Sequence, residues 1–368
     1  MQYNYREKIR KVTERMEETG VDLFLASPGS DMKYLIGYEH PQDDKLLLLA
    51  ILRNGASFVI HNRLQDIDTE RTPVDRMMAY AYEVQPLDLF RQEMSGHEDI
   101  MIRRIALSAN MPVFFGLELR SLYPQVEFIR TEEITGPLRA IKDEDEMEAT
   151  RQACKKAEQA LKICMDLGTY WLGRTERQLE ARMMYEMGNL GLRHNAVSVC
   201  FGPNAASCHH HPDDTVITEG HPLLIDFGAD YHFYNTDMTR MFFFGTADDE
   251  YRRMYEMVRE AERRGIEAAV CGNTLQELDR VVRDYLTQQG YGEYYIHRTS
   301  HGVGLDCHDY PAIPAGGRTE IQDGMIFSVE PGVYFNGRYG IRIEDQVMMH
   351  NGKAEVLHSF TKELIEIR

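Results

Sequence analysis

The segment Leu223-Leu-Ile-Asp226-Phe-Gly228 joins an apolar run to a carboxylate and a glycine, and Met325-Ile-Phe-Ser-Val-Glu330-Pro-Gly332 has the same form. Short apolar runs of this kind are typical of buried strands. We therefore expect Asp226 and Glu330 to lie at the ends of buried strands and away from solvent. A further carboxylate follows each of them, Asp237 eleven residues after Asp226 and Glu344 fourteen residues after Glu330.

These segments belong to a longer repeat with a period of 99 residues. Thr175 and Thr274 each begin a capping-box pattern, which is typical of a helix N-terminus, and Cys-His-x-x-Pro occurs at residues 208–212 and again at 307–311. Longer helices are predicted before them, over residues 143–165 and 249–270. Such a repeat indicates two similar α/β halves that share a central site. A purely architectural duplication is the alternative, and the apolar surroundings of the carboxylates argue against it.

The first part of the chain, residues 1–135, predicts a separate and smaller α/β domain. An amphipathic helix is expected over residues 6–19, followed by apolar strands over residues 21–25, 45–52, 57–60 and 105–107. Pro137 and the acidic stretch at 142–146 mark a boundary, because acidic residues favour a helix N-terminus. The length of 368 residues, at roughly 150 residues per domain, agrees with two domains, here 1–135 and 140–368.

Composition and charge exclude several functional classes. The chain carries 41 Lys and Arg against 59 Asp and Glu, a net charge of −18, and an acidic surface repels the phosphates of nucleic acid. The longest apolar run, residues 46–52, is too short to span a bilayer, and the charged first twenty residues contain no secretory signal. Six cysteines in so long a chain indicate reduced thiols. We expect a cytoplasmic protein without nucleic-acid or membrane partners.

Several buried carboxylates are predicted to converge on the shared site, namely Asp226, Asp237, Glu330, Glu344 and Asp345. Unpaired buried carboxylates are costly, so a convergent group needs cations among its members. Arg240 and Arg342 could neutralise two of the five. A metal site is therefore favoured over a core that is neutralised by arginine alone.

His301 offers a nitrogen ligand for such a site, since the glycines of Ser300-His301-Gly302-Val303-Gly304 leave its imidazole room to approach an ion. One imidazole with four carboxylates suits hard or borderline ions. Bridging carboxylates fit two ions better than one. We expect two divalent ions, Mn²⁺ or Co²⁺ first, with Zn²⁺ or Fe²⁺ as alternatives.

Four motifs resemble those of the pita-bread metallopeptidases, and within that group the Xaa-Pro aminopeptidases and Xaa-Pro dipeptidases (prolidases). They lie at residues 225–240, 301–311, 330–334 and 340–345. The resemblance covers the chain from about residue 140 in detail and the first 135 residues more loosely. It implies a creatinase/prolidase-like α/β domain followed by a pita-bread catalytic domain, hydrolysis of the peptide bond before proline, a proline-containing peptide or dipeptide substrate, and a homodimer.

The resemblance also implies a role for each matching metal ligand. Asp226 would bind one ion, Asp237 and Glu344 would bridge both ions, and His301 and Glu330 would complete the second. The nucleophile would be a hydroxide between the ions. Glu330 would also pass its proton toward the leaving nitrogen.

Four further residues would act on the substrate by the same resemblance. His209 and His308 would hold the substrate and stabilise the tetrahedral intermediate, Arg342 would contact substrate or support Glu344, and Tyr334 would line the pocket. Because residues 209–211 are all histidines, the sequence leaves open which one faces the ions, although the spacing to Pro212 favours His209. Cys208 and Cys307, which flank site histidines, are expected to be small core residues.

Other functions are compatible with the same fold. A creatinase-like hydrolase, a lyase, or a non-catalytic scaffold for protein binding would each be marked by loss of metal ligands. All five ligand positions are filled in this chain, which favours the metallopeptidase. The sequence does not distinguish a dipeptidase from an aminopeptidase of longer peptides.

Overall fold

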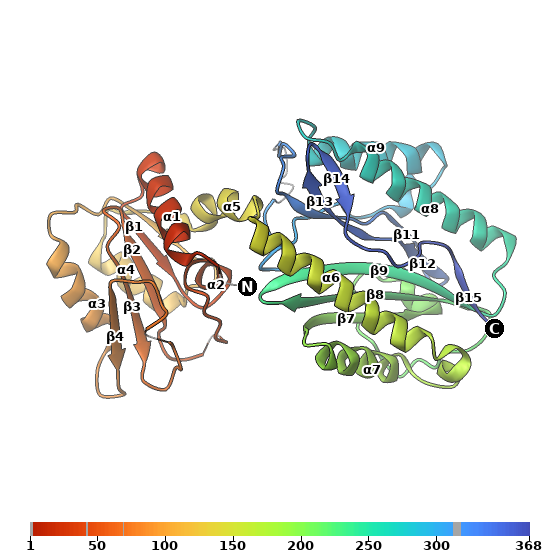
Figure 1. Ribbon diagram of the computed structural model, residues 1–368, viewed down its shortest axis with the longest axis horizontal. Helices are drawn as coiled ribbons and strands as arrows, with labels where there is room; N and C mark the ends of the chain where they lie inside the picture. The colour runs from red at the N-terminus through yellow and green to blue at the C-terminus, as the bar shows by residue number, and fades with distance from the viewer. Residues whose placement is uncertain (1–2, 42, 69, 312–317) are drawn as a thin grey trace. The chain divides into compact units, whose positions relative to one another are not determined.

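The apolar segments of the N-terminal part form a six-stranded sheet in the order β4-β3-β2-β1-β5-β6 (Figure 1). Its strands are β1 (Leu23–Ala26), β2 (Leu48–Leu52), β3 (Ser57–Asn62), β4 (Arg76–Tyr80), β5 (Arg104–Leu107) and β6 (Glu127–Arg130). Strands β1, β2 and β3 are buried throughout. This explains the continuous apolar runs of β1 and β2 and the apolar Phe58-Val-Ile60 within β3. The helices are α1 (Tyr5–Thr19), α2 (Ser30–Ile36), α3 (Pro86–Met94), α4 (Val113–Leu122) and α5 (Glu132–Ala140).

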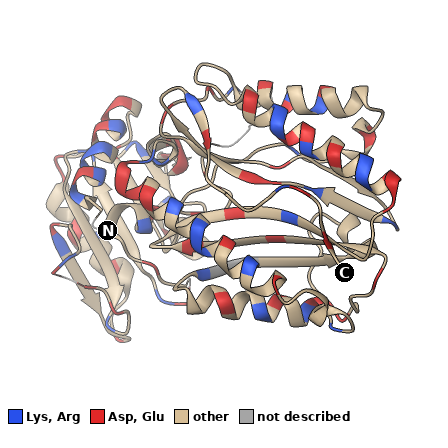
Figure 2. Cartoon of the chain, turned by 45° about the vertical axis from the view of Figure 1, so that its right-hand side comes forward, with Lys and Arg blue, Asp and Glu red and all other residues tan. Residues whose placement is uncertain are grey.

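The computed structural model describes residues 3–41, 43–68, 70–311 and 318–368. The chain divides into two compact units, residues 2–139 and residues 140–368. Charged residues of both signs lie along the helices (Figure 2), and Arg263, for example, pairs with Glu260. Within the described ranges, no helix is long and apolar enough to cross a membrane.

The second unit repeats the order of two helices followed by strands. Helices α6 (Glu144–Met165) and α7 (Glu176–Asn189) precede β7 (Arg193–Phe201), β8 (His221–Tyr231) and β9 (Tyr234–Phe244). Helices α8 (Asp249–Ala268) and α9 (Leu275–Gln288) precede β10 (Ile326–Val329), β11 (Gly332–Phe335), β12 (Tyr339–Arg342), β13 (Asp345–His350) and β14 (Lys353–Val356). A last strand, β15 (Ile365–Ile367), pairs with β9 and completes a four-stranded sheet of the second unit, in the order β15-β9-β8-β7.

The helix N-termini follow the sequence prediction closely. Asp143 and Thr175 both form complete capping boxes at the starts of α6 and α7. At α9 the Thr274 hydroxyl accepts from the Glu277 N–H, as predicted, but the Glu277 carboxylate pairs with Arg280. The expected second half of that capping box is replaced by an ion pair one turn along the helix.

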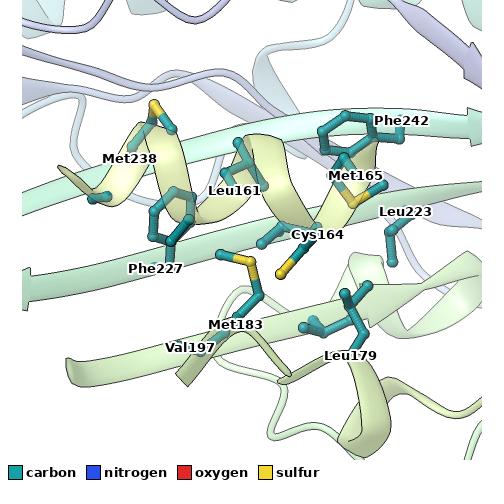
Figure 3. Packing of buried hydrophobic residues seen from close by; sticks show 14 of the residues in the cluster. Leu161, Cys164, Met165, Leu179, Met183, Val197, Leu223, Phe227, Met238 and Phe242 are labelled. Atoms are coloured by element: carbon teal, nitrogen blue, oxygen red, sulfur yellow. The ribbon is translucent and has the colours of Figure 1, made fainter. Parts of the chain in front are cut away.

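The β8–β9 hairpin lies at the centre of the second unit and has two differently covered faces. Phe227 and Met238 belong to the core that packs under α6 and α7 (Figure 3). Leu224 and Met241, which point the other way, join the core with α8 and β12. Asp226 lies in the middle of β8 and not at its end as predicted, because the strand continues through Tyr231. It shares the face of Leu224, the face that is turned toward the second half.

Candidate metal centre

A cavity of about 350 Å³ opens on the face of the β8–β9 hairpin that is turned toward the second half. It holds eight of the residues that the sequence predicted for the site, whereas Tyr334 and Asp345 are not among its described lining residues. The described residues that line it are Cys208, His209, Asp226, Asp237, His297, Arg298, Ser300, His301, His308, Asp309, Glu330, Arg342 and Glu344.

The register of the hairpin brings the first two carboxylates together. Asp226 is paired with Thr239, and Gly228 is paired with Asp237. Paired residues share a face of the sheet, so Asp226 and Asp237 are diagonal neighbours on one face. The Cys307 thiol lies beside Gly228 and donates to Asp237 Oδ2 at 2.9 Å.

Glu330 and Glu344 reach the same place from the second half. Glu330 directly follows β10, as the sequence predicted, and its Oε1 accepts from Ser328 Oγ at 3.2 Å. Glu344 lies between β12 and β13, and its backbone forms a bridge with Thr239 of β9. The Thr239 hydroxyl donates to Glu344 Oε2 at 2.7 Å. This bridge places the Glu344 carboxylate beside the β8–β9 hairpin.

His301 presents a lone pair to the carboxylates. Its Nδ1 lies 3.1 Å from the Gly302 carbonyl oxygen, which can only accept, so Nδ1 carries the proton. Its Nε2 lies 3.3 Å from Glu330 Oε1 and 3.5 Å from Asp237 Oδ2. Burial lowers the pKa of His301 to about 4, so the ring is neutral near pH 7. A lone pair that faces two carboxylate oxygens calls for a cation between them.

The charges of three buried carboxylates also indicate a bound cation. Burial, reinforced by neighbouring acids, raises the pKa of Asp237, Glu330 and Glu344 well above the usual range. Glu344 Oε1 is buried and has no hydrogen-bond partner. Ligand atoms of Asp237, His301 and Glu344 all lie within 4.8 Å of one another. Within the described chain, none of the three carboxylates pairs with Lys or Arg. The donor set therefore fits one or more divalent cations.

The two arginines pair with carboxylates as predicted, but with different consequences. Arg342 Nη2 lies 2.6 Å from Asp226 Oδ2 inside the site. Arg240 Nη2 lies 2.5 Å from Asp345 Oδ1, and Lys362 lies 2.7 Å from the other oxygen of Asp345. Burial alone would raise the pKa of Asp345, but the cations around it lower it far below its usual range.

Asp345 therefore does not belong to the converging group, contrary to the prediction. Successive residues of a strand point to opposite faces, so Glu344 faces the cavity and Asp345 faces a buried ion-pair network. Four carboxylates and one imidazole converge, not five carboxylates.

Among the residues predicted to act on the substrate, some line the cavity and Tyr334 does not. His209 and His308 both line the cavity, and the His308 ring stacks on His301 with ring centroids 3.9 Å apart. His210 turns away and bonds Glu176, while His211 is exposed. Tyr334 is not among the described lining residues.

Tyr334 instead supports two residues that do line the cavity. Its hydroxyl lies 2.8 Å from His297 Nε2 and 2.8 Å from Arg342 Nη1. Cys208, expected to be a core residue, lines the cavity as well.

Sequence reasoning missed His297 and Arg298. His297 Nδ1 bonds the Arg298 carbonyl oxygen at 2.8 Å, and burial lowers the pKa of His297 to about 4. The available signal was the spacing of four residues between His297 and His301. Because residues 297–301 lie in neither a helix nor a strand, periodicity could not show that both rings face one cavity.

The raised pKa values predict how stability changes with pH once metal is removed. A carboxyl whose folded pKa is raised contributes full stability below its unfolded pKa, about 4, and loses it as pH rises through the folded pKa. For Asp237, Glu330 and Glu344 the loss continues as pH rises until each carboxyl ionises. The melting temperature of chelator-treated protein should therefore fall between pH 5 and pH 8.

Calorimetry with and without Mn²⁺ tests this expectation. Saturating Mn²⁺ should restore the melting temperature at pH 8. In the chelated protein, Glu344→Gln should raise the melting temperature at pH 8 and flatten its pH dependence. A chelated wild type that is as stable at pH 8 as at pH 5 would show that the carboxylates do not repel one another.

Comparisons with known proteins identify the family. Residues 148–351, more than half of the chain, match the model of metallopeptidase family M24, and residues 8–141 match the creatinase/prolidase N-terminal domain. These matches confirm both the resemblance and the fold class that the sequence predicted: an α/β N-terminal domain followed by a catalytic domain of two similar halves.

Individual relatives agree over nearly the whole chain. An uncharacterized peptidase of Staphylococcus saprophyticus is 30% identical over 361 residues, 96% of this chain and 100% of the relative. The Xaa-Pro dipeptidase of Pyrococcus horikoshii is 28% identical over 98% of this chain and 99% of its own. The crystal structure of a prolidase from Thermococcus sibiricus matches with a TM-score of 0.91 and 29% identity over 100% of both chains. The chain therefore belongs to metallopeptidase family M24, with a creatinase/prolidase N-terminal domain before its peptidase domain.

Proposed function

We propose that this peptidase hydrolyses the bond between an N-terminal residue and proline, with two divalent ions in its cavity. The observation that carries the proposal is the convergence of four carboxylates and the neutral His301 on one cavity. The Xaa-Pro dipeptidase and prolidase among the relatives support the choice of bond. The described residues of the cavity carry no feature that favours a creatinase-like enzyme, a lyase or a binding scaffold over a metallopeptidase.

The lining of the cavity supports a proposed ligand set. In it, Asp237 and Glu344 would hold both ions, Asp226 would hold one, and His301 and Glu330 would hold the other. When bound, the ions would supply a Lewis acid for the scissile carbonyl and lower the pKa of a water nucleophile. Arg342 binds Asp226 Oδ2 and donates from Nε to Thr239 Oγ1, so it fixes two ligands at once.

Glu330 is suited to move the proton. It lines the cavity, and a carboxylate within hydrogen-bond reach of the attacking water can accept its proton. Ser328 holds its Oε1. Glu330 would take the proton of the attacking water and give it to the leaving nitrogen of proline.

His209 and His308 stand on the cavity wall as donors to the substrate carbonyl. Burial lowers the pKa of His308, so the ring is neutral and donates from one nitrogen only. Charge that develops on the carbonyl oxygen is stabilised by such preorganised donors. The Tyr334 hydroxyl, through its bonds to His297 and Arg342, positions both side chains.

Substrate choice is tested by comparing Leu-Pro, Met-Pro, Arg-Pro-Pro and Leu-Gly with Mn²⁺ and with a chelator. Proline provides no N–H to a general peptidase and fixes its own backbone angle. We expect metal-dependent hydrolysis with Xaa-Pro preferred over Leu-Gly. Equal rates on Leu-Pro and Leu-Gly would refute the proline specificity. The ratio of Leu-Pro to Arg-Pro-Pro turnover distinguishes a dipeptidase from an aminopeptidase.

His308→Ala is expected to keep its bound metal and to lose turnover of Leu-Pro by about 10²–10³-fold, as when a donor to a developing oxyanion is removed. Steady-state kinetics and metal analysis of the same sample measure both. His211→Ala, at an exposed histidine, is the matched control and should retain wild-type turnover. Unchanged turnover in His308→Ala would exclude the proposed role of His308.

The proposal extends to the identity of the ions, the localisation and the oligomeric state. We propose Mn²⁺ or Co²⁺ as the working ions, with Zn²⁺ or Fe²⁺ as alternatives, because oxygen-rich sites suit them. We also propose a cytoplasmic homodimer without nucleic-acid or membrane partners. Metal analysis of protein purified without added metal, together with sedimentation, tests the ion and the oligomeric state.

A further inference from the structure

We propose that Glu176 is a positioning residue that holds the segment 201–213 in place, so that His209, and not His210, faces the cavity. Glu176 is fully buried at the start of α7, and it has no part in the metal centre. The inference rests on the proposed function of His209 on the cavity wall.

Both oxygens of Glu176 accept hydrogen bonds from this segment. Oε1 accepts from the Phe201 N–H at 2.6 Å and from Asn204 Nδ2 at 3.0 Å. Oε2 accepts from the Asp213 N–H at 3.1 Å and lies 2.8 Å from His210 Nε2. The four donors come from both ends and from the interior of the segment. Hydrogen bonds to a buried carboxylate are the strong, charge-assisted kind.

The carboxylate is free for this task because the helix is capped by other residues. Thr175 and Gln178 form the complete capping box of α7. The Glu176 N–H donates to the Thr215 carbonyl oxygen, which ties the helix start to the chain just beyond the segment. The positive end of the helix dipole also favours a carboxylate at this position.

A metal ion does not explain the cluster. Ligand atoms of Glu176, His210 and Asp213 lie within 4.8 Å of one another. However, a carboxylate offers about four acceptor positions, and all four of Glu176 are used by N–H donors. A cation at this point would face N–H groups instead of lone pairs. The cluster is a hydrogen-bonded anchor.

The anchor determines which histidine reaches the cavity. His210 is held by Glu176, His211 is exposed, and His209 lines the cavity. The segment is also fixed from its other side, because the Ala205 carbonyl oxygen packs where Gly340 of β12 has no Cβ. Arg342 is the last residue of β12, and Glu344 follows two residues later. Residues 201–213 therefore contact the start of α7 on one side and strand β12 on the other.

Glu176→Gln and His210→Phe test the anchor. Glu176→Gln keeps the shape of the side chain but turns one acceptor into a donor that faces N–H groups. His210→Phe removes the imidazole N–H, one of the four donors to Glu176. Each should lower kcat on Leu-Pro by roughly 10–100-fold, the range for supports of a functional site, with KM and bound metal nearly unchanged. His210→Gln, which keeps an N–H donor, should recover most of kcat, and His211→Ala should match wild type.

Hydrogen exchange of residues 201–213, read by mass spectrometry, tests the anchor without any substrate. Faster exchange in Glu176→Gln and His210→Phe, but not in His210→Gln or His211→Ala, supports it. Wild-type exchange and kcat in both variants would overturn it, as would equal losses in His210→Gln and His210→Phe. If wild type hydrolysed no Xaa-Pro peptide, the proposed function would fail, while the exchange data would still decide whether Glu176 holds the segment.

Discussion

Asp237→Asn and Glu344→Gln are each expected to abolish hydrolysis of Leu-Pro and to lower bound metal. Ligand atoms of both carboxylates lie within 4.8 Å of each other and of a ligand atom of His301, so each substitution removes one of the ligands on which the proposed function depends. Loss of roughly 4 kcal/mol of transition-state stabilisation corresponds to about 10³-fold in kcat/KM. Metal analysis and steady-state kinetics on one preparation measure the two effects together.

Asp345→Asn provides a matched control for this experiment. Asp345 is adjacent to Glu344 and as deeply buried, but it pairs with Arg240 and Lys362. Its substitution should lower the melting temperature, because the buried Arg240 and the partly exposed Lys362 lose an anionic partner, while bound metal stays near the wild-type level. If Glu344→Gln retained full metal and turnover, the ligand assignment would be wrong.

Glu330→Gln is the second substitution with a severe expected effect. It removes a ligand next to His301 and the group that would carry the proton, so kcat should fall by at least the roughly 10²–10⁴-fold that general acid–base catalysis contributes. Rates are compared at saturating Mn²⁺, which offsets weaker metal binding. The remaining loss then reports proton transfer.

Ser328→Ala perturbs Glu330 without removing its carboxylate. The Ser328 hydroxyl donates to Glu330 Oε1 and also accepts from the His301 N–H, so its removal should disturb the orientation of both residues. A smaller loss of kcat than in Glu330→Gln is expected. Turnover in Glu330→Gln within threefold of wild type at saturating Mn²⁺ would show that another group handles the proton.

The sequence was informative about the site because its ligands stand in apolar surroundings. The apolar run before Glu330 predicted a buried strand that ends at the carboxylate, and this is what β10 shows. The alternation in Ile341-Arg342-Ile343-Glu344 placed two polar residues on one face, and both line the cavity. In each case a local pattern determines the direction of the side chain.

Features that depend on pairing between distant segments could not be read in this way. Asp345 was grouped with the ligands, although the same alternation turns it away from Glu344 and toward Arg240. The placement of Asp226 in mid-strand depends on the length of the β8–β9 pairing. Nothing in the sequence singled out Glu176, because its hydrogen bonds to residues 201–213 depend on the fold that places that segment beside the start of α7.

The most direct test of the metal-dependent mechanism is a titration of chelator-treated protein with Mn²⁺, in which bound ions per chain and Leu-Pro hydrolysis are measured at each step. Two ions per chain at full activity, with no hydrolysis in the metal-free protein, is the expected result. Full hydrolysis of Leu-Pro by protein that holds less than about a tenth of an ion per chain would contradict a mechanism in which the ions activate the nucleophile.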